Sequence, residues 1–107
     1  MRNINKNFLS FKNETIKDAL KKIIKNGTRT VLVLDQKKKL LGTLSEGDVQ
    51  KFLIKNKDIN SKIDNIFNRF PEKVDSKKID KDKLREKFIS KQLGLLPVVN
   101  NNNIVEK

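Results

Sequence analysis

The sequence contains no cysteine, histidine, tryptophan or tyrosine. The absence of cysteine excludes a disulfide framework and a thiol nucleophile, and the absence of histidine removes the usual imidazole base. An ordinary zinc site is excluded as well, because carboxylates alone suit harder cations. Much catalysis is therefore excluded by composition.

Long apolar segments are also missing. The longest apolar runs have four or five residues, whereas a membrane-spanning helix needs about 20. Residues 1–12 have no apolar signal-peptide core. These features favour a cytoplasmic protein without a membrane segment. The 107 residues, 36% of them hydrophobic, suffice for one compact unit or for two small halves that share a core.

The charge is strongly basic, with 25 basic and 13 acidic residues and a formal net charge of +12. Such a charge can attract nucleic acid. The lysines are spread along the whole chain, however, and the arginine and aromatic side chains that read or stack on bases are few. We therefore attribute the charge to a lysine-rich composition and expect no nucleic-acid partner.

Residues 14–26 predict an amphipathic helix. Five apolar residues repeat there at the i, i+3, i+4, i+7 and i+8 spacing of one helical face. They are Ile16, Ala19, Leu20, Ile23 and Ile24. Thr15 can cap the first turn together with Asp18, three residues on, and Gly27 stands where a left-handed residue ends many helices.

Two strands and a second helix follow. Residues 30–34 form an aliphatic and β-branched run without a polar face, which is typical of a strand covered on both sides. The polar segment 35–39 predicts a tight turn into a second strand over residues 40–44. Residues 47–56 then predict a helix, because three apolar residues share one face. These residues are Val49, Phe52 and Leu53.

Residues 57–70 predict a connecting segment, with a short helix packed by one side. Its apolar residues are Ile59, Ile63, Ile66 and Phe67. The order of elements then repeats: residues 71–76 predict an extended lead-in, and residues 95–99 predict a strand that leads into a polar turn at 100–103. Between them, a second helical face is marked by Leu84, Phe88 and Ile89.

A shift of 64 or 65 residues superimposes the two halves of the sequence. It places Leu20 on Leu84, Ile24 on Phe88, Val33–Leu34 on Val98–Val99, and Leu40–Leu41 on Ile104–Val105. We interpret the halves as two diverged copies of one unit. Pro97 cannot donate to a sheet ladder, so its strand should be an edge strand or should carry the proline where no donor is needed.

The segment from Gly42 to Asp48 combines a hydroxyl, Ser45, with a carboxylate three residues on, where the second helix should begin. A helix start presents free N–H groups to an anion, and a carboxylate can accept hydrogen bonds from two hydroxyls. Gly47 would let a backbone approach closely. Lys51, one turn on, could offset phosphate charge or face solvent. The same Ser-x-x-Asp spacing can equally form a helix cap.

The order of these elements resembles a tandem cystathionine-β-synthase (CBS) domain pair. The resemblance rests on the run at 30–35, on Leu40 to Val49 with its Gly-h-h-Ser-x-x-Asp pattern, and on Leu-Pro-Val-Val at 96–99. It implies an α/β (α+β) fold of two βαββα-type repeats in a pseudo-two-fold arrangement. The implied boundaries are a first repeat at 1–56, a connecting segment at 57–70, and a second repeat at 71–107 that is incomplete at its C-terminus.

The resemblance also implies a function. CBS pairs are regulatory modules, not enzymes, and their clefts hold adenosine-containing ligands, commonly AMP, ADP, ATP or S-adenosylmethionine. In the family pattern the hydroxyl meets phosphate and the carboxylate meets ribose, which corresponds here to Ser45 and Asp48. We therefore expect a ligand site of Gly42, Ser45, Gly47, Asp48 and Lys51, with no required cofactor. A homodimer is also expected.

The sequence of residues 42–48 is similar to that of CBS pairs found N-terminal to nucleotidyltransferase domains that make activated sugars. It departs from them after Asp48, where Val49-Gln50-Lys51 replaces their usual Ile-Arg-Arg. This similarity predicts that the chain is a regulatory N-terminal fragment, with the catalytic domain beyond Lys107. The alternatives are a structural or dimerisation CBS module without ligand and, as the weakest, a basic nucleic-acid-binding domain.

Overall fold

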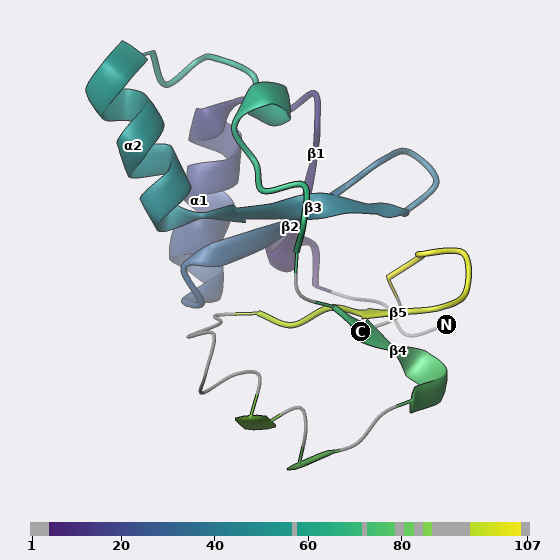
Figure 1. Ribbon diagram of the computed structural model, residues 1–107. Coiled ribbons are helices and arrows are strands. Elements are labelled where there is room, and N and C mark those ends of the chain that lie inside the picture. The colour runs from purple at the N-terminus through teal and green to yellow at the C-terminus, as the bar shows by residue number, and fades with distance from the viewer. Residues whose placement is uncertain are drawn as a thin grey trace.

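The computed structural model describes residues 5–56, 58–71, 73–78, 81–82, 85–86 and 95–105. They form a mixed α+β fold (Figure 1). The first half comprises β1 (Leu9–Phe11), α1 (Ile16–Asn26), β2 (Thr30–Leu34), β3 (Leu40–Ser45) and α2 (Glu46–Asn56). The second half contains β4 (Val74–Asp75) and β5 (Val98–Val99), and single 3-10 turns span Lys6–Phe8, Ile63–Asn65 and Ser76–Lys78.

The first sheet has the strand order β1-β2-β3, with β1 parallel and β3 antiparallel to β2. Side chains alternate between faces along β2. Val31 and Val33 join the core beneath α1 and α2, whereas Leu32 and Leu34 join a second core shared with Val99 of β5. Figure 1 shows both helices beside the sheet and the second half below it. The prediction that β2 is covered on both faces is confirmed.

Both predicted ends of α1 are confirmed. The Thr15 hydroxyl accepts from the Asp18 amide, and the Asp18 carboxylate accepts from the Thr15 amide, each at 3.2 Å. Gly27 ends the helix with a φ of 72°. The prediction that Ile24 faces the core is wrong, since this side chain is 72% exposed. Eight residues at 100° each carry it about 80° around the helix from Ile16, past the edge of the buried face.

Strand β1 was not predicted, because three residues give no periodic pattern. It exists through its pairing with β2, in which Leu9 and Phe11 lie opposite Leu32 and Leu34. The central residue, Ser10, is fully buried.

The short helix predicted within residues 59–67 forms only as the 3-10 turn Ile63–Asn65, so that prediction is wrong in extent. The surrounding backbone instead bonds to the first half: the amide of Ile63 donates to the carbonyl of Glu14 at 3.0 Å, and the amide of Asn68 donates to that of Thr43 at 2.7 Å. Ile63 and Phe67 are buried in the core beneath the helices. The segment is therefore part of the packing of the first half.

The second half repeats the parallel pairing of the first, because β4 lies parallel to β5 as β1 does to β2. The strand predicted at 95–99 is limited to Val98–Val99. Pro97 lies just before it, is buried, and accepts a hydrogen bond from the amide of Val74 at 2.9 Å, so no donor is needed there. The helical face at Leu84, Phe88 and Ile89 lies outside the described residues.

The turn after β2, at 35–39, and the turn after β5, at 100–103, have the same pattern of hydrogen bonds. Asp35 Oδ1 accepts from the amides of the residues two and four positions on, and Asn100 Oδ1 does the same, at distances of 2.8 to 3.1 Å. Lys38 and Asn103 both have left-handed backbones, with φ of 66° and 62°. The two copies are therefore offset by 65 residues along the sequence. The predicted alignment of Leu40 with Ile104, which needs an offset of 64, is wrong by one residue.

Candidate functional site

The hydroxyl and carboxylate segment lies where β3 runs directly into α2. Ser45 is the last residue of the strand, and its amide donates to Asp48 Oδ2 at 3.0 Å. The Asp48 amide donates in return to Ser45 Oγ at 3.1 Å. The two residues thus form a capping box, which is the alternative geometry that the sequence left open.

The box leaves part of its hydrogen-bonding capacity unused. Asp48 Oδ1 is not one of its acceptors, and the Ser45 hydroxyl, which accepts within the box, still carries a hydrogen to donate. Both side chains are only half-buried. A ligand with hydroxyl groups could therefore bind to Asp48 without breaking the cap.

A cation lies beside the box. Thr30, at the start of β2, is the ladder partner of Ser45, which brings the preceding Arg29 to the start of α2. The carbonyl of Arg29 accepts from the Glu46 amide at 2.8 Å, and its Nε lies 3.9 Å from Glu46 Oε2. The Arg29 side chain is 85% exposed, so its remaining donors face solvent.

Sequence reasoning missed Arg29, since only the pairing of β2 with β3 brings it to this place. Its backbone is left-handed, with a φ of 64°, a conformation that costs a residue with a side chain about 1 to 2 kcal/mol. The polar loop around it holds this conformation. Asn26 Nδ2 donates to the Thr30 carbonyl at 3.0 Å, and Asn26 Oδ1 accepts from the Thr28 amide and hydroxyl, both at 2.8 Å.

The other predicted site residues are Gly47, Lys51 and Gly42, and they lie in different surroundings. Gly47 is exposed in the first turn of α2, where an added Cβ would lie 3.7 Å from Ser45 Oγ. Lys51, one turn on, lines a shallow cavity of about 230 Å³ together with Asp48 and Phe52. Gly42 lies inside β3, where an added Cβ would come within 2.0 Å of the Asn68 carbonyl oxygen. Its geometry is that of a close backbone contact.

The charges at the helix start determine which end of a ligand could go where. The N-terminus of α2 carries a partial positive charge, but two acidic residues of the first turn, Glu46 and Asp48, already occupy it. An anionic group is therefore favoured on the side of Arg29 and the Ser45 hydroxyl. Neutral hydroxyl groups are favoured at Asp48, since a carboxylate repels an anion and accepts from a hydroxyl.

Two further features are absent from the described residues. No group of three or more acidic side chains is placed there to hold a metal ion. In the same part of the chain, no helix has the length and apolarity needed to cross a membrane.

Comparison with known families and structures gives the following matches. Residues 4–55 match the model of the CBS domain. The CBS domains of a transcriptional regulator from Streptococcus pneumoniae are 22% identical, over 92% of this chain and 76% of that chain, with a TM-score of 0.75. The CBS domain pair of protein MJ0100, in complex with 5′-methylthioadenosine and S-adenosyl-L-methionine, is 23% identical, with the same coverage and TM-score.

A third structure, CBSX2 in complex with AMP, is 17% identical over 91% of this chain and 76% of that chain, with a TM-score of 0.73. No curated protein sequence matches the chain.

Proposed function

We propose that the chain is a regulatory module that binds an adenosine-containing ligand of the AMP, ADP or ATP type, because residues 4–55 match the model of the CBS domain and the chain has the fold of CBS domain pairs. The ligands of the similar structures, AMP in one and two adenosine derivatives in another, support this ligand class. We assign no chemical step to the chain.

The observation that carries the proposal is the grouping of a hydroxyl, a carboxylate and a guanidinium at one end of the β2–β3 pair. The phosphate would lie between Arg29 and the Ser45 hydroxyl, and the ribose hydroxyls would donate to Asp48. Gly47 leaves the backbone open on this side, and Lys51 would add long-range attraction to the phosphate. Gly42 would act indirectly, by letting β3 approach the 67–68 segment.

Regulation would follow from the way in which the two halves share a core. On one face of β2, Leu32 and Leu34 pack against Val99 and Val105 of the second half. A nucleotide that binds differently to two arrangements of the halves would shift their populations, by no more than its difference in affinity for them. The repeats at 1–56 and 71–107, joined by residues 57–70, are the units that would move. A homodimer would extend this shift to a second copy.

A finer proposal concerns what is regulated. The sequence of residues 42–48 supports a sugar-1-phosphate nucleotidyltransferase as the enzyme attached to this module. Binding of AMP would then report the energy state of the cell to that enzyme. Co-purification of nucleotidyltransferase activity with the longer protein, responsive to AMP, is the result expected; activity indifferent to AMP would contradict it.

Calorimetric titration of the chain with AMP, ADP and ATP, and with adenosine as the uncharged control, tests the ligand proposal. We expect saturable binding of at least one nucleotide and weaker binding of adenosine. Arg29→Gln should weaken nucleotide binding about tenfold, through loss of a charge-assisted contact, while leaving adenosine unchanged. Absence of binding at millimolar nucleotide would contradict the proposal.

The second candidate is a structural or dimerisation module, in which the Ser45 and Asp48 pair only caps α2. The capping box itself favours it, because both side chains already have partners. It predicts a dimer that forms equally well with and without nucleotide, which sedimentation analysis would distinguish from a ligand-dependent assembly.

A further inference from the structure

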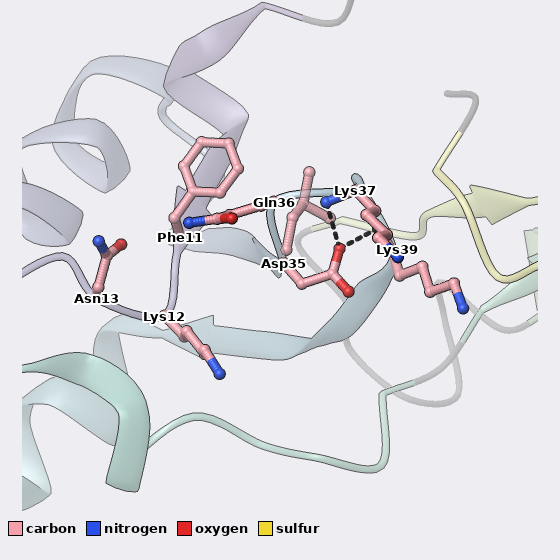
Figure 2. Close-up of a pocket in the computed structure, with 8 residues that line it drawn as sticks. Phe11, Lys12, Asn13, Asp35, Gln36, Lys37 and Lys39 are labelled. Atoms are coloured by element: carbon pink, nitrogen blue, oxygen red, sulfur yellow. Dashed lines mark hydrogen bonds between the residues drawn. The ribbon is translucent and has the colours of Figure 1, made fainter.

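A cavity of about 510 Å³ lies at the carboxyl ends of β1 and β2 (Figure 2). This volume falls in the range of roughly 300 to 1,000 Å³ that is typical of small-molecule sites. The cavity is at the opposite end of β2 from the Ser45 and Asp48 box: its wall includes Leu34, and the ladder partner of Ser45 is Thr30. Thr30 and Leu34 lie four positions apart along β2, about 13 Å at 3.3 Å per residue.

The topology explains why the sheet is open at this point. From the end of β1 the chain leaves for α1, which covers one face of the sheet, whereas from the end of β2 it turns back at once into β3. Neighbouring parallel strands whose connections diverge leave a crevice outside their carboxyl ends, and ligands of open α/β sheets bind in such crevices.

Hydrogen bonds fix both walls of the cavity. On the β1 side, the Glu14 amide donates to the Phe11 carbonyl at 2.9 Å, and Lys62 Nζ donates to the Asn13 carbonyl at 2.8 Å. On the β2 side, the turn is closed by Asp35 Oδ1, which accepts from the amides of Lys37 and Lys39 at 2.8 and 2.9 Å. The site is therefore preformed, which lowers the entropic cost of binding.

The lining combines positive charge with an apolar surface. Lys12, Lys37 and Lys39 surround the cavity, and within the described residues none of them forms a salt bridge. The single carboxylate, that of Asp35, is turned back onto its own turn, as the dashed lines in Figure 2 show. These positive charges favour an anion in the cavity.

The apolar part of the lining is suited to a flat ring. Phe11, at the end of β1, contributes a partly exposed apolar side chain, whereas the Leu34 side chain is buried in the second core. Figure 2 shows the side-chain amide of Gln36 extending from the turn toward Phe11. An aromatic side chain and a planar amide close to each other offer a stacking surface and a polar edge.

We propose that this cavity is a binding site for a small aromatic anion, a phosphate or carboxylate carried on a flat ring, independent of the nucleotide site at Ser45 and Asp48. The ring packs on Phe11, Gln36 bonds to its polar edge, and the anionic group is held by Lys12 and Lys37.

The test is a titration of the ¹⁵N-labelled chain with phenyl phosphate and, separately, with benzoate, followed through its amide resonances. We expect saturable shifts centred on Lys12, Gln36 and Lys37 with at least one of the two anions, which also identifies the preferred anionic group. Benzyl alcohol, which has the ring without the charge, and inorganic phosphate, which has the charge without the ring, should both bind at least about tenfold more weakly.

A pair of double variants separates this site from general attraction to a basic protein. Lys12→Gln/Lys37→Gln should weaken phenyl phosphate binding about tenfold. Lys17→Gln/Lys77→Gln removes the same charge from exposed positions outside the cavity and should leave the affinity within about twofold of the wild type. Non-saturating shifts spread over the surface, or equal losses in the two variants, would overturn the proposal. The amides of Ser45 and Asp48 report on the nucleotide site in the same spectra, so the two proposals fail independently.

Discussion

The two helices of the first half begin with the same device in different surroundings. At α1, Thr15 and Asp18 exchange two hydrogen bonds of 3.2 Å; at α2, Ser45 and Asp48 exchange two of 3.0 and 3.1 Å. Both are reciprocal capping boxes. A hydroxyl and a carboxylate at three-residue spacing therefore do not make a ligand site by themselves, since the pair at α1 has the same local geometry.

The surroundings of the two boxes differ in what lies beside them. The box at α1 follows an exposed turn, and Lys21 and Lys22 stand one turn beyond its carboxylate. The box at α2 ends a strand of the sheet, and the Thr30–Ser45 pairing brings Arg29 beside it. Any capacity of the second box to bind a nucleotide must come from this tertiary context.

Both boxes are tied to the same connecting segment. The Ile16 amide donates to the Ser61 carbonyl at 2.9 Å, and the Thr43 amide donates to the Asn68 carbonyl at 3.0 Å. The second attachment depends on Gly42, because a side chain there would collide with Asn68 and Phe67. The two helix starts can therefore be loosened separately.

Gly42→Ala should have the largest effect of the substitutions that distinguish the start of α2 from the start of α1. The added Cβ would lie 2.0 Å from the Asn68 oxygen, so backbone must move, and we expect a loss of about 3 kcal/mol in the free energy of unfolding. Urea denaturation measures the loss. Hydrogen exchange should accelerate more at the Asp48 amide than at the Asp18 amide.

Gly47→Ala is the matched control, because its Cβ would meet only Ser45 Oγ at an ordinary 3.7 Å. Alanine is favoured over glycine inside a helix, so stability should stay unchanged or rise by up to about 1 kcal/mol. A similar loss in both variants would show that the contact with Asn68 is not what makes Gly42 sensitive.

The features that were predicted correctly from sequence are those encoded by neighbouring residues. The cap at Thr15, the left-handed Gly27 and the turn at 35–39 follow from local chemistry, and the uniformly apolar β2 follows from the absence of a polar face. Ser45 and Asp48 were identified as a pair, with capping as one of two interpretations. The fold class could be stated because these local signals occur in a characteristic order.

The features that were missed depend on contacts between distant residues. Strand β1 is too short to have a pattern and exists through its pairing with Leu32 to Leu34. The segment 59–68 forms hydrogen bonds to the backbone of Glu14 and Thr43 instead of a longer helix. Arg29 enters the candidate site only through the alignment of Thr30 with Ser45. No local signal could have identified these placements.

Replacing the two carboxylates in turn tests whether context distinguishes the boxes. Asp18→Ala and Asp48→Ala should each cause a similar small loss of stability without ligand, because each removes one half of a capping box. With AMP present, the rise in melting temperature should persist in Asp18→Ala and be largely lost in Asp48→Ala, as expected for a tenfold or greater loss of affinity, about 1.4 kcal/mol. Thermal denaturation with and without AMP measures both effects. If the two variants respond to AMP alike, Asp48 is only a cap.

The smallest expected effect concerns acid stability at the first box. The backbone amide of Thr15, then the Thr15 side chain, and more weakly the charges of Lys21 and Lys22 hold the pKa of Asp18 below its ordinary value. A carboxyl whose pKa is lower in the folded state stabilises the protein above its unfolded pKa of about 3.9, and this contribution is lost as the pH falls through the folded pKa. Asp18→Asn removes the titration while keeping an acceptor at the cap. The free energy of unfolding of the wild type, measured by urea denaturation, should therefore fall more steeply below about pH 4 than that of Asp18→Asn. Parallel curves would mean that the hydrogen bonds from Thr15 do not favour the charged form of Asp18 in solution.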